Sequence, residues 1–330
     1  MNATGSDRYP STLGGRGWAG RPATHGGDVS AGVIWLRCGQ RSETGALRRV
    51  LLARPPRSLG LIEDHARALV LDRVDVAAMR AQTDDIAASY ERNGVTVHVA
   101  DVPETAPPNI VFMRDLFFMT ADGAVLGRMA SAARSGEERH AAAALAGLGV
   151  PILRTVAGAA TFEGADALWL APDSVVVGTG FRTNLAAVRQ LREVLREQGV
   201  RVRMVPLPAG VQHLLGVVVP LGRGLAAVHS AAAGAGLRTI LRAHGLTPVE
   251  IPPCPDLLDA RGMNLVPLEP GRVLMPAGAP VVRDALAAEG VHTEEVAIGE
   301  YVKAAGGIGC LTGILCRDGE TERGASPGQG

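Results

Sequence analysis

The chain has 330 residues, of which 47% are hydrophobic and 20% are charged, and its 33 lysine and arginine residues balance 33 aspartate and glutamate residues. This neutrality disfavours binding to nucleic acid or to an anionic membrane, and the lack of a run of about 18 uncharged apolar residues disfavours a membrane-spanning helix. The four cysteines show neither a CxxC pattern nor the spacing of a metal site, so we expect reduced thiols in a cytoplasmic protein.

Both ends of the chain have the composition of disordered tails. Residues 1–30 are rich in Gly, Ser, Thr, Pro and Arg and show no hydrophobic periodicity, so we expect an N-terminal tail there or a misassigned start of the chain. The sequence GETERGASPGQG predicts a second disordered tail over residues 319–330. Residues 31–318 are then expected to form one α/β domain, which is long enough to bury a large core.

Between the tails, a helix-like segment ends at a glycine and is followed by a β-prone run, and this happens five times. The glycines follow one another at intervals of 55, 50, 46 and 45 residues and are Gly94, Gly149, Gly199, Gly245 and Gly290. Each has the place of a helix stop in the left-handed conformation, which glycine adopts at the lowest cost. Residues 182–198 illustrate the helices, because a helix there places four apolar residues on one face, namely Leu185, Val188, Leu191 and Leu195.

Each repeat also contains a further β-prone segment. We predict strands within residues 109–120, 165–180 and 263–278, the last two with a Pro or Gly turn inside a hairpin. The resulting unit is ββαβ, and a single unit of this kind cannot close a hydrophobic core. Five units arranged around an axis can, so the repeat predicts an α/β fold, a five-bladed propeller with pseudo-fivefold symmetry.

Polar residues recur at matching places in these units. They lie 14 to 21 residues after the stop glycines and are Asp115, Glu163, His213, Asn264 and Cys310. Equivalent positions of a ring converge at one end of its axis, so we expect these side chains to face one pocket. Cysteine-dependent group transfer requires a thiol, a base, a residue that orients the base and a carboxylate anchor. Cys310 is the candidate nucleophile, because it lies between a glycine-rich turn and a short apolar run.

Each of these residues, taken alone, also has an ordinary structural explanation. Cys310 fits a small buried thiol, and His213 fits a hydrogen-bonded strand histidine. Asp115 fits an ion-pair partner of Arg114, while Glu163 fits part of a turn. Their matching positions in separate repeats favour the shared pocket over these explanations.

Five motifs follow one another in order: NIVFMRD from residue 109, FEGAD from residue 162, RTN from residue 182, the histidine of VQHLLG and the glycine-flanked cysteine of GGIGCLTGIL. With these motifs, the chain resembles the guanidino-group modifying superfamily of arginine deiminases, amidinotransferases and dimethylarginine dimethylaminohydrolases, from about residue 42 to residue 315. The resemblance implies a five-bladed α/β propeller. It also implies that Asp115 holds the guanidinium, that Glu163 orients the histidine and that Asp166 is a supporting acid. His213 would then act as acid and base, and Cys310 would attack the substrate.

The resemblance extends to the other end of the substrate. Superfamily members that bind the α-carboxylate of arginine use two arginines, and Arg134 and Arg182 stand where these are expected. A planar guanidinium suits a carboxylate, so the resemblance implies an α-amino acid substrate. Asn109 is expected to assist at the same end of the pocket. The alternative for both arginines is an ordinary solvated position.

The sequence departs from the superfamily pattern beside the histidine. Deiminases and amidinotransferases usually carry HxD, whose aspartate contacts the far side of the guanidinium, whereas here Leu214 and Leu215 follow His213. An apolar Leu215 suits a nitrogen that carries methyl groups. Dimethylarginine dimethylaminohydrolases also lack this aspartate, so the resemblance is strongest to them. Gly309 stands where histidine is frequent, and Ala165 replaces a second glycine of the acidic motif.

We therefore expect a cysteine-dependent hydrolase that converts a dimethylarginine-like substrate to citrulline and an amine through a thiouronium intermediate. Its expected partner is a small guanidino compound, and the reaction needs neither a metal nor an organic cofactor. The sequence leaves a homodimer open. It also leaves open an amidinotransferase or deiminase acting on another guanidino compound. A non-catalytic binding protein is a third option, because a ribosome anti-association factor has the same five-bladed ring.

Overall fold

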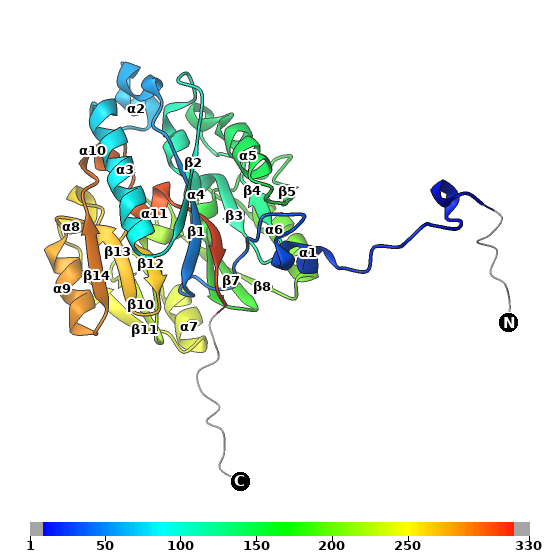
Figure 1. The fold of residues 1–330 in the computed structure, drawn as a ribbon. Helices are drawn as coiled ribbons and strands as arrows, with labels where there is room; N and C mark the ends of the chain where they lie inside the picture. The colour runs from blue at the N-terminus through cyan, green and yellow to red at the C-terminus, as the bar shows by residue number, and fades with distance from the viewer. Residues whose placement is uncertain (1–8, 320–330) are drawn as a thin grey trace, which may run out of the picture.

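The computed structural model describes residues 9–319, and in this range fifteen strands form five separate sheets of three strands each (Figure 1). Every sheet combines one antiparallel and one parallel strand pair, as a ββαβ unit requires. The strands, sheet by sheet, are β15 (Gly313–Arg317), β1 (Leu47–Ala53) and β2 (Thr96–Ala100); β3 (Phe117–Met119), β4 (Ala124–Leu126) and β5 (Ile152–Thr155); β6 (Ala167–Ala171), β7 (Ser174–Thr179) and β8 (Arg201–Pro206); β9 (Val218–Gly222), β10 (Leu225–His229) and β11 (Thr247–Ile251); β12 (Val266–Glu269), β13 (Arg272–Pro276) and β14 (His292–Val296).

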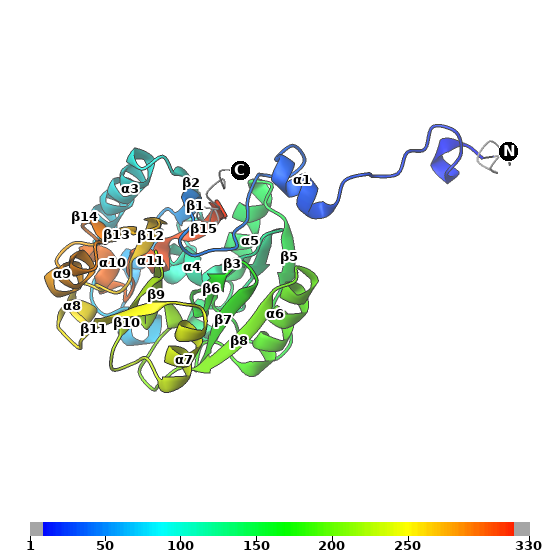
Figure 2. The ribbon, with the colours of Figure 1, turned by 90° about the horizontal axis from the view of Figure 1, so that it is seen from below.

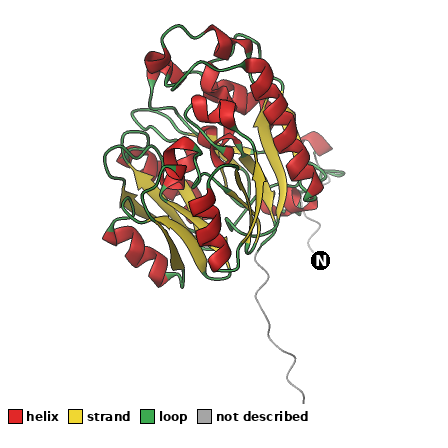
Figure 3. Ribbon diagram, turned by 90° about the vertical axis from the view of Figure 1, so that its left-hand side faces the viewer, coloured by secondary structure: helices red, strands yellow, loops and turns green. Residues whose placement is uncertain are grey.

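A long helix leads into the last strand of each sheet. These helices are α3 (Val76–Arg92), α5 (Glu137–Gly147), α6 (Leu185–Glu197), α7 (Ala235–Ala243) and α9 (Pro280–Ala288). All five predicted stop glycines follow them closely and have φ between 68° and 76°, so the prediction of left-handed helix stops is confirmed. Figure 2 shows the five helices at the periphery with the strands inside, and Figure 3 shows the same layering from the side.

Helix α6 shows how one blade buries its apolar face. Asn184 caps the helix by accepting a hydrogen bond from the backbone N–H of Ala187. Of the four apolar residues placed on one face of this helix, three are buried, whereas Leu185 is 54% exposed. Leu185 is the first residue of the helix. The buried residues of the helix are Ala187, Val188, Leu191 and Leu195.

The five sheets close into a ring. β15 comes from the C-terminal end of the described chain and pairs antiparallel with β1, so the last strand completes the first blade. Between blades, β15 contacts β3, β9 contacts β12, and β12 contacts β1. The 3-10 helices η6 (Gly164–Asp166) and η7 (Leu214–Gly216) contact each other and join the second, third and fourth blades. The predicted five-bladed α/β propeller is confirmed.

The prediction of a disordered tail over residues 1–30 is wrong for its last part. Residues 25–31 form helix α1 (His25–Ala31), whose Val29 is only 1% exposed. Thr24 caps the helix by accepting from the N–H of Gly27, and Gly32 ends it in the left-handed conformation. Residues 1–8 lie outside the described residues, and so does the predicted C-terminal tail from residue 320 onward.

Short helices complete the described chain. They are η2 (Ser11–Leu13), η3 (Arg57–Leu61), α2 (His65–Ala68), η4 (Pro108–Val111), α4 (Met113–Leu116), η5 (Ala132–Arg134), α8 (Asp256–Asp259), α10 (Gly299–Lys303) and α11 (Ile308–Leu311). None of the helices within residues 9–319 is long and apolar enough to cross a membrane.

Candidate active site

The five polar residues in matching positions all lie shortly before the first strand of a blade. Two of them lie on short helices, Asp115 on α4 before β3 and Cys310 on α11 before β15. Glu163 and His213 directly precede η6 and η7, and Asn264 lies two residues before β12. The strand predicted within residues 109–120 is present only as β3, because η4 and α4 occupy the earlier part of the segment.

Cys310 and His213 line the same cavity, whose volume is about 210 Å³. Leu215, Asn264 and Arg261 also line it. Cys310 is 7% exposed and His213 is 4% exposed, so both groups are largely shielded from water. The fold thus brings together a thiol and an imidazole from two blades, with a leucine beside them.

Two carboxylates hold the imidazole of His213. Its Nε2 lies 2.7 Å from Oε2 of Glu163, and its Nδ1 lies 3.7 Å from Oδ1 of Asp115. Burial alone would lower the pKa of His213, but Asp115, Glu163 and Asp166 outweigh it and raise the pKa to about 9. The imidazole is therefore protonated at neutral pH and can donate a proton to a leaving group.

Glu163 stays ionised inside the protein. Burial would raise its pKa, but the hydrogen bond and charge of His213, together with Arg134 and Arg182, hold the pKa of Glu163 well below its usual range. Nη1 of Arg182 lies 3.1 Å from Oε2 of Glu163, and Nη1 of Arg134 lies 3.2 Å from the same oxygen. A permanent negative charge at Glu163 keeps the imidazolium of His213 in place.

Arg134 binds carboxylates of the protein, whereas the sequence predicts that it binds a carboxylate of the substrate. Its Nη1 donates to Oδ2 of Asp115 at 2.6 Å and to Glu163 at 3.2 Å, while Nε and Nη2 donate to Oε2 of Glu137 at 3.0 and 2.8 Å. All three nitrogens of the guanidinium therefore face carboxylates of the protein, and the side chain is 2% exposed. Asp115 is the partner of Arg134 and not of Arg114, which pairs with Glu43 at 3.1 Å. This geometry gives Arg134 the task of holding the acids.

Arg182 and Asn109 are less directly connected to the cavity. Nη1 of Arg182 binds Glu163, and its guanidinium lies 5.2 Å from the ring centre of Phe181. Asn109 donates from Nδ2 to the carbonyl oxygen of Ala68 at 2.8 Å, which joins η4 to α2. Neither residue lines the cavity of Cys310. Their roles at a substrate carboxylate stay predictions.

Asp166 and Leu215 shape the loop that carries His213. Oδ1 of Asp166 accepts a hydrogen bond from the backbone N–H of Leu214 at 2.9 Å, and burial raises the pKa of Asp166 to about 6. Leu215 lines the cavity and is 4% exposed. A Cβ atom at Gly309 would lie 2.9 Å from Cδ2 of Leu215 and 3.0 Å from Oδ1 of Asn264, so a larger residue there would displace side chains that line the cavity.

Asn264 binds the nucleophile candidate at two points. Its Nδ2 donates to Sγ of Cys310 at 3.0 Å, and its Oδ1 accepts from the backbone N–H of Cys310 at 2.9 Å. Sequence reasoning placed Asn264 in the row of matching residues but assigned it no role. The signal was its position, 19 residues after Gly245, which is close to the offset of Cys310 from Gly290.

The thiol of Cys310 is neutral in the free protein. Burial and the charge of Asp115 raise its pKa to about 11, although the Gly307 backbone, Asn264 and Arg261 act in the opposite direction. A thiol with this pKa is a weak nucleophile at neutral pH. A positively charged substrate beside the sulfur would favour the thiolate, so activation can come from the substrate itself.

The acids around His213 also have the geometry of a cation site. One ligand atom each of Asp115, Glu163 and His213 lies within 4.8 Å of the other two. Two arginines already neutralise the carboxylates, and Nε2 of the imidazole is committed to Glu163. The donor set therefore fits an ion-pair network better than a metal ion.

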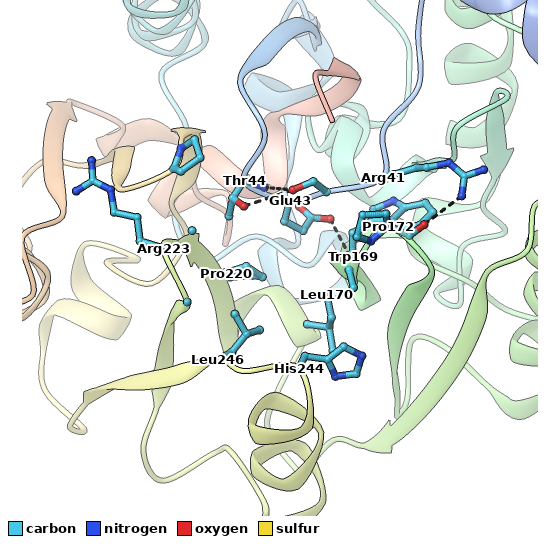
Figure 4. Close-up of a pocket in the computed structure, with 15 residues that line it drawn as sticks. Arg41, Glu43, Thr44, Trp169, Leu170, Pro172, Pro220, Arg223, His244 and Leu246 are labelled. Carbon is cyan, nitrogen blue, oxygen red and sulfur yellow. Dashed lines mark hydrogen bonds between the residues drawn. The ribbon is translucent and has the colours of Figure 1, made fainter. Parts of the chain in front are cut away.

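A second cavity, of about 450 Å³, contains none of the candidate chemical groups (Figure 4). Arg41, Glu43, Arg223 and His244 are among its lining residues. Glu43 connects it to the core, because its carboxylate pairs with Arg114, the neighbour of Asp115. Cavity size alone does not locate the site.

Comparison with known proteins gives a consistent picture. A family model described as arginine deiminase matches residues 64–209. An uncharacterized protein of Aeropyrum pernix is 31% identical over 271 residues, which cover 80% of this chain and 93% of that protein. A dimethylarginine dimethylaminohydrolase of Streptomyces coelicolor is 29% identical over 265 residues, covering 80% of this chain and 96% of that enzyme.

Solved structures agree in fold. A dimethylarginine dimethylaminohydrolase of Pseudomonas aeruginosa, in a cysteine-to-serine variant complexed with citrulline, superimposes with a TM-score of 0.68 at 23% identity. The alignment covers 83% of this chain and all of that one. With the propeller, the motif order and these relatives together, the chain belongs to the guanidino-group modifying enzyme superfamily.

Proposed function

We propose that the protein is a cysteine-dependent hydrolase that acts on the guanidino group of a dimethylarginine-like substrate and releases citrulline and dimethylamine. The main support is one observation: Cys310, His213 and Leu215 line the same cavity. Behind the histidine, Glu163 holds the imidazolium, and Oδ1 of Asp115, which has no hydrogen-bond partner among residues 9–319, is left to accept from an incoming guanidinium. The streptomycete relative, which carries the name of this activity, adds support.

The first step is attack by sulfur. A substrate guanidinium beside Asp115 and Cys310 lowers the pKa of the thiol, whose proton passes to solvent. The thiolate adds to the central carbon of the guanidinium, forming a C–S bond. The imidazolium of His213 then protonates the dimethylated nitrogen, the C–N bond breaks, and dimethylamine leaves a thiouronium adduct on Cys310.

The second step is hydrolysis. His213 is neutral after giving up its proton, so it can accept one from water. The resulting hydroxide adds to the central carbon of the adduct, the C–S bond breaks, and the hydroxyl proton passes to solvent as the ureido carbonyl forms. The products are citrulline and the thiolate of Cys310. In an amidinotransferase an amine takes the place of this water.

Leu215 supports a methylated substrate. Its side chain lines the cavity beside His213, at the place where an HxD motif would put a carboxylate. A carboxylate there would accept hydrogen bonds from an unsubstituted nitrogen, whereas a dimethylated nitrogen offers fewer donors and two apolar methyl groups. Dimethylarginine therefore suits this cavity better than arginine does.

Incubation with three substrate sets tests the proposal: dimethylarginine, arginine, and arginine with glycine. Citrulline, dimethylamine and ornithine are measured by mass spectrometry. We expect citrulline and dimethylamine from the first set. Ornithine from the third set would instead identify an amidinotransferase, and citrulline from arginine alone a deiminase. Turnover of no set would favour the non-catalytic binding protein.

A further inference from the structure

Two arginines and one glutamate line a small cavity near the axis of the propeller. They are Arg114 on α4, Arg317 at the end of β15 and Glu43 in the segment before β1, and each of them is buried. This central cavity has a volume of about 10 Å³, and β6, β9, β12 and β15 from four blades supply its other walls. It shares Leu215 with the Cys310 cavity and Glu43 with the cavity of Figure 4, so it lies between the two.

The charges around the central cavity do not balance. Glu43 pairs with Arg114, whose Nη2 lies 3.1 Å from Oε1 of the glutamate. Arg317 takes part in none of the ion pairs formed within residues 9–319, and its Nη1 donates to the neutral carbonyl oxygen of Gly45 at 2.9 Å. Two positive charges and one negative charge leave one positive charge without a counterpart, which is costly inside a protein.

The surroundings of Arg317 supply no second negative charge within the described chain. Tyr90 and Cys316 are the other titratable side chains that act on it, and burial raises the pKa of both, so both are neutral at neutral pH. Burial lowers the pKa of Arg317 to about 10, while Glu43 opposes this change and Arg114 adds to it. Because this pKa lies well above neutral pH, Arg317 keeps its charge.

Two hydrogen-bond donors at the central cavity also lack an acceptor. Nε of Arg114 and Nε of Arg317 are buried without a hydrogen-bond partner within residues 9–319. Nε of Arg182 and Nε of Arg261 are unpartnered as well, but neither of these arginines lines the central cavity. What marks this cavity is therefore the combination of two such donors with an unbalanced positive charge. Each buried N–H without an acceptor costs free energy.

A single small anion would remove both deficits. It would accept hydrogen bonds from the two N–H groups and neutralise the excess charge, whereas a water molecule would accept the hydrogen bonds and leave the charge. A volume of about 10 Å³ holds one particle of about the size of a water molecule. Phosphate and carboxylate groups are too large for it, and a halide ion is the anion that comes closest in size.

We propose that the central cavity is a binding site for one halide ion, chloride in biological solutions, which is held between Nε of Arg114 and Nε of Arg317. The site does not depend on the reaction at Cys310. It has a consequence for the active site, because Arg114 precedes Asp115 on α4 and both are buried. An ion that fixes Arg114 therefore also fixes the short helix that carries Asp115.

Thermal unfolding of the native protein tests the site. Sodium chloride is compared with sodium gluconate at equal ionic strength, because gluconate is too large for the central cavity. The unfolding midpoint should rise by about 2 °C between no chloride and about 100 mM chloride and then level off, as expected for one saturable site. No rise relative to gluconate, or a rise that does not level off, would overturn the proposal.

Two arginine variants show where the chloride acts. Arg317→Met removes the excess charge and one donor but leaves the pair of Glu43 and Arg114, so the remaining charges balance and the midpoint should no longer depend on chloride. Arg261→Met is the matched control, since Nε of Arg261 is also unpartnered but this residue lines the Cys310 cavity. It should keep the chloride dependence of the native protein. A dependence that survives Arg317→Met, or that Arg261→Met also abolishes, would contradict the site.

Bromide locates the ion directly. Crystals of the native protein grown in sodium bromide are measured at the bromine absorption edge, and we expect an anomalous difference peak between Nε of Arg114 and Nε of Arg317. The measurement needs neither a variant nor turnover, so it decides the proposal even if Arg317→Met does not fold or dimethylarginine is not a substrate. Density for water in the central cavity, without an anomalous peak, would overturn the proposal and leave the proposed function untouched.

Discussion

The cavity of Figure 4 and the cavity of Cys310 differ in whether their polar side chains have hydrogen-bond partners within the protein. In the first, which holds about 450 Å³, Arg41 donates to the carbonyl oxygens of Pro172 and Gln198. Both ring nitrogens of His244 lie within hydrogen-bond distance of oxygen atoms. The polar side chains at its wall mainly hold the propeller together.

The Cys310 cavity is smaller, about 210 Å³, but its polar groups are unusual. The pKa of His213 is raised to about 9 and that of Cys310 to about 11. Nε of Arg261, which lines the cavity, and Oδ1 of Asp115, which lies behind His213, are buried without a hydrogen-bond partner among the described residues. Groups that the fold leaves perturbed or unpaired identify a chemical site better than volume does.

Replacing the proposed nucleophile of the Cys310 cavity should cause the largest loss of activity. Cys310→Ser should lower kcat for dimethylarginine by about 10⁴-fold or more, because a serine hydroxyl is a far weaker nucleophile. Citrulline release, followed by mass spectrometry, measures the loss. A variant that keeps more than a tenth of the native rate would show that the thiol does not react.

Glu163→Gln should cause the second-largest loss of activity. The amide keeps the size of the side chain but loses the charge that holds the imidazolium, so the pKa of His213 should fall and kcat should drop about 10²- to 10³-fold. Glu137→Gln is the matched control, because Glu137 also pairs with Arg134 but makes no contact with His213. Equal losses of kcat in both variants would mean that Glu163 acts only through folding.

Asn264→Ala should have an intermediate effect. The variant removes both contacts with Cys310, so we expect kcat to fall about 10- to 100-fold. The pKa of the Cys310 thiol should rise further, since the Asn264 hydrogen bond lowers it. The pH dependence of iodoacetamide labelling reads this pKa directly. A midpoint that stays at the native pH would contradict the contact with sulfur.

Activity should also depend on pH through His213. The imidazolium must be present for the first step, so kcat should fall about tenfold per pH unit above about 9.

The stability of the fold should also depend on pH through His213. Because the pKa of His213 in the folded protein is raised above its ordinary value of 6.5, the imidazolium stabilises the fold fully below pH 6.5, and this contribution is lost as the pH rises through about 9. Thermal unfolding over this range measures it, and an unfolding midpoint that rises would contradict the assignment.

The smallest effect is expected at the cavity of Figure 4. His244→Gln should change kcat/KM less than about twofold, because the hydrogen bonds of His244 within residues 9–319 go to Ile240 and Ser174, away from Cys310. The assay should run well below the unfolding temperature of the variant. A loss of kcat/KM as large as that of Asn264→Ala would show that the two cavities are coupled, and would contradict a purely structural role for the cavity of Figure 4.

Much of the fold could be predicted from the sequence, because a glycine follows each of the five long helices and can be recognised in the sequence. The spacing from Gly94 to Gly290 indicated five blades, and the polar residues at matching places pointed to one end of the axis. Helix α1 was missed although Thr24 and Gly32 are ordinary capping residues, since the composition around them suggested disorder.

The details of the site were less predictable. The short helices α4 and α11 have four residues each, too few for a periodic pattern. The pairing of Arg134 with Glu137 had a weak signal, an acid three residues later, but its contacts with Asp115 and Glu163 depend on the folded ring. The strained conformation of Arg261 had no signal, because Gly262 is the residue expected to take a positive φ.

The covalent adduct is the most direct test of the central claim that Cys310 attacks a guanidinium. Turnover of dimethylarginine is quenched with acid within milliseconds, and the peptide that contains Cys310 is examined by mass spectrometry. We predict an added mass equal to the substrate minus dimethylamine, on this cysteine and on no other. Citrulline formation without any adduct on Cys310, at times when turnover is under way, would contradict the account.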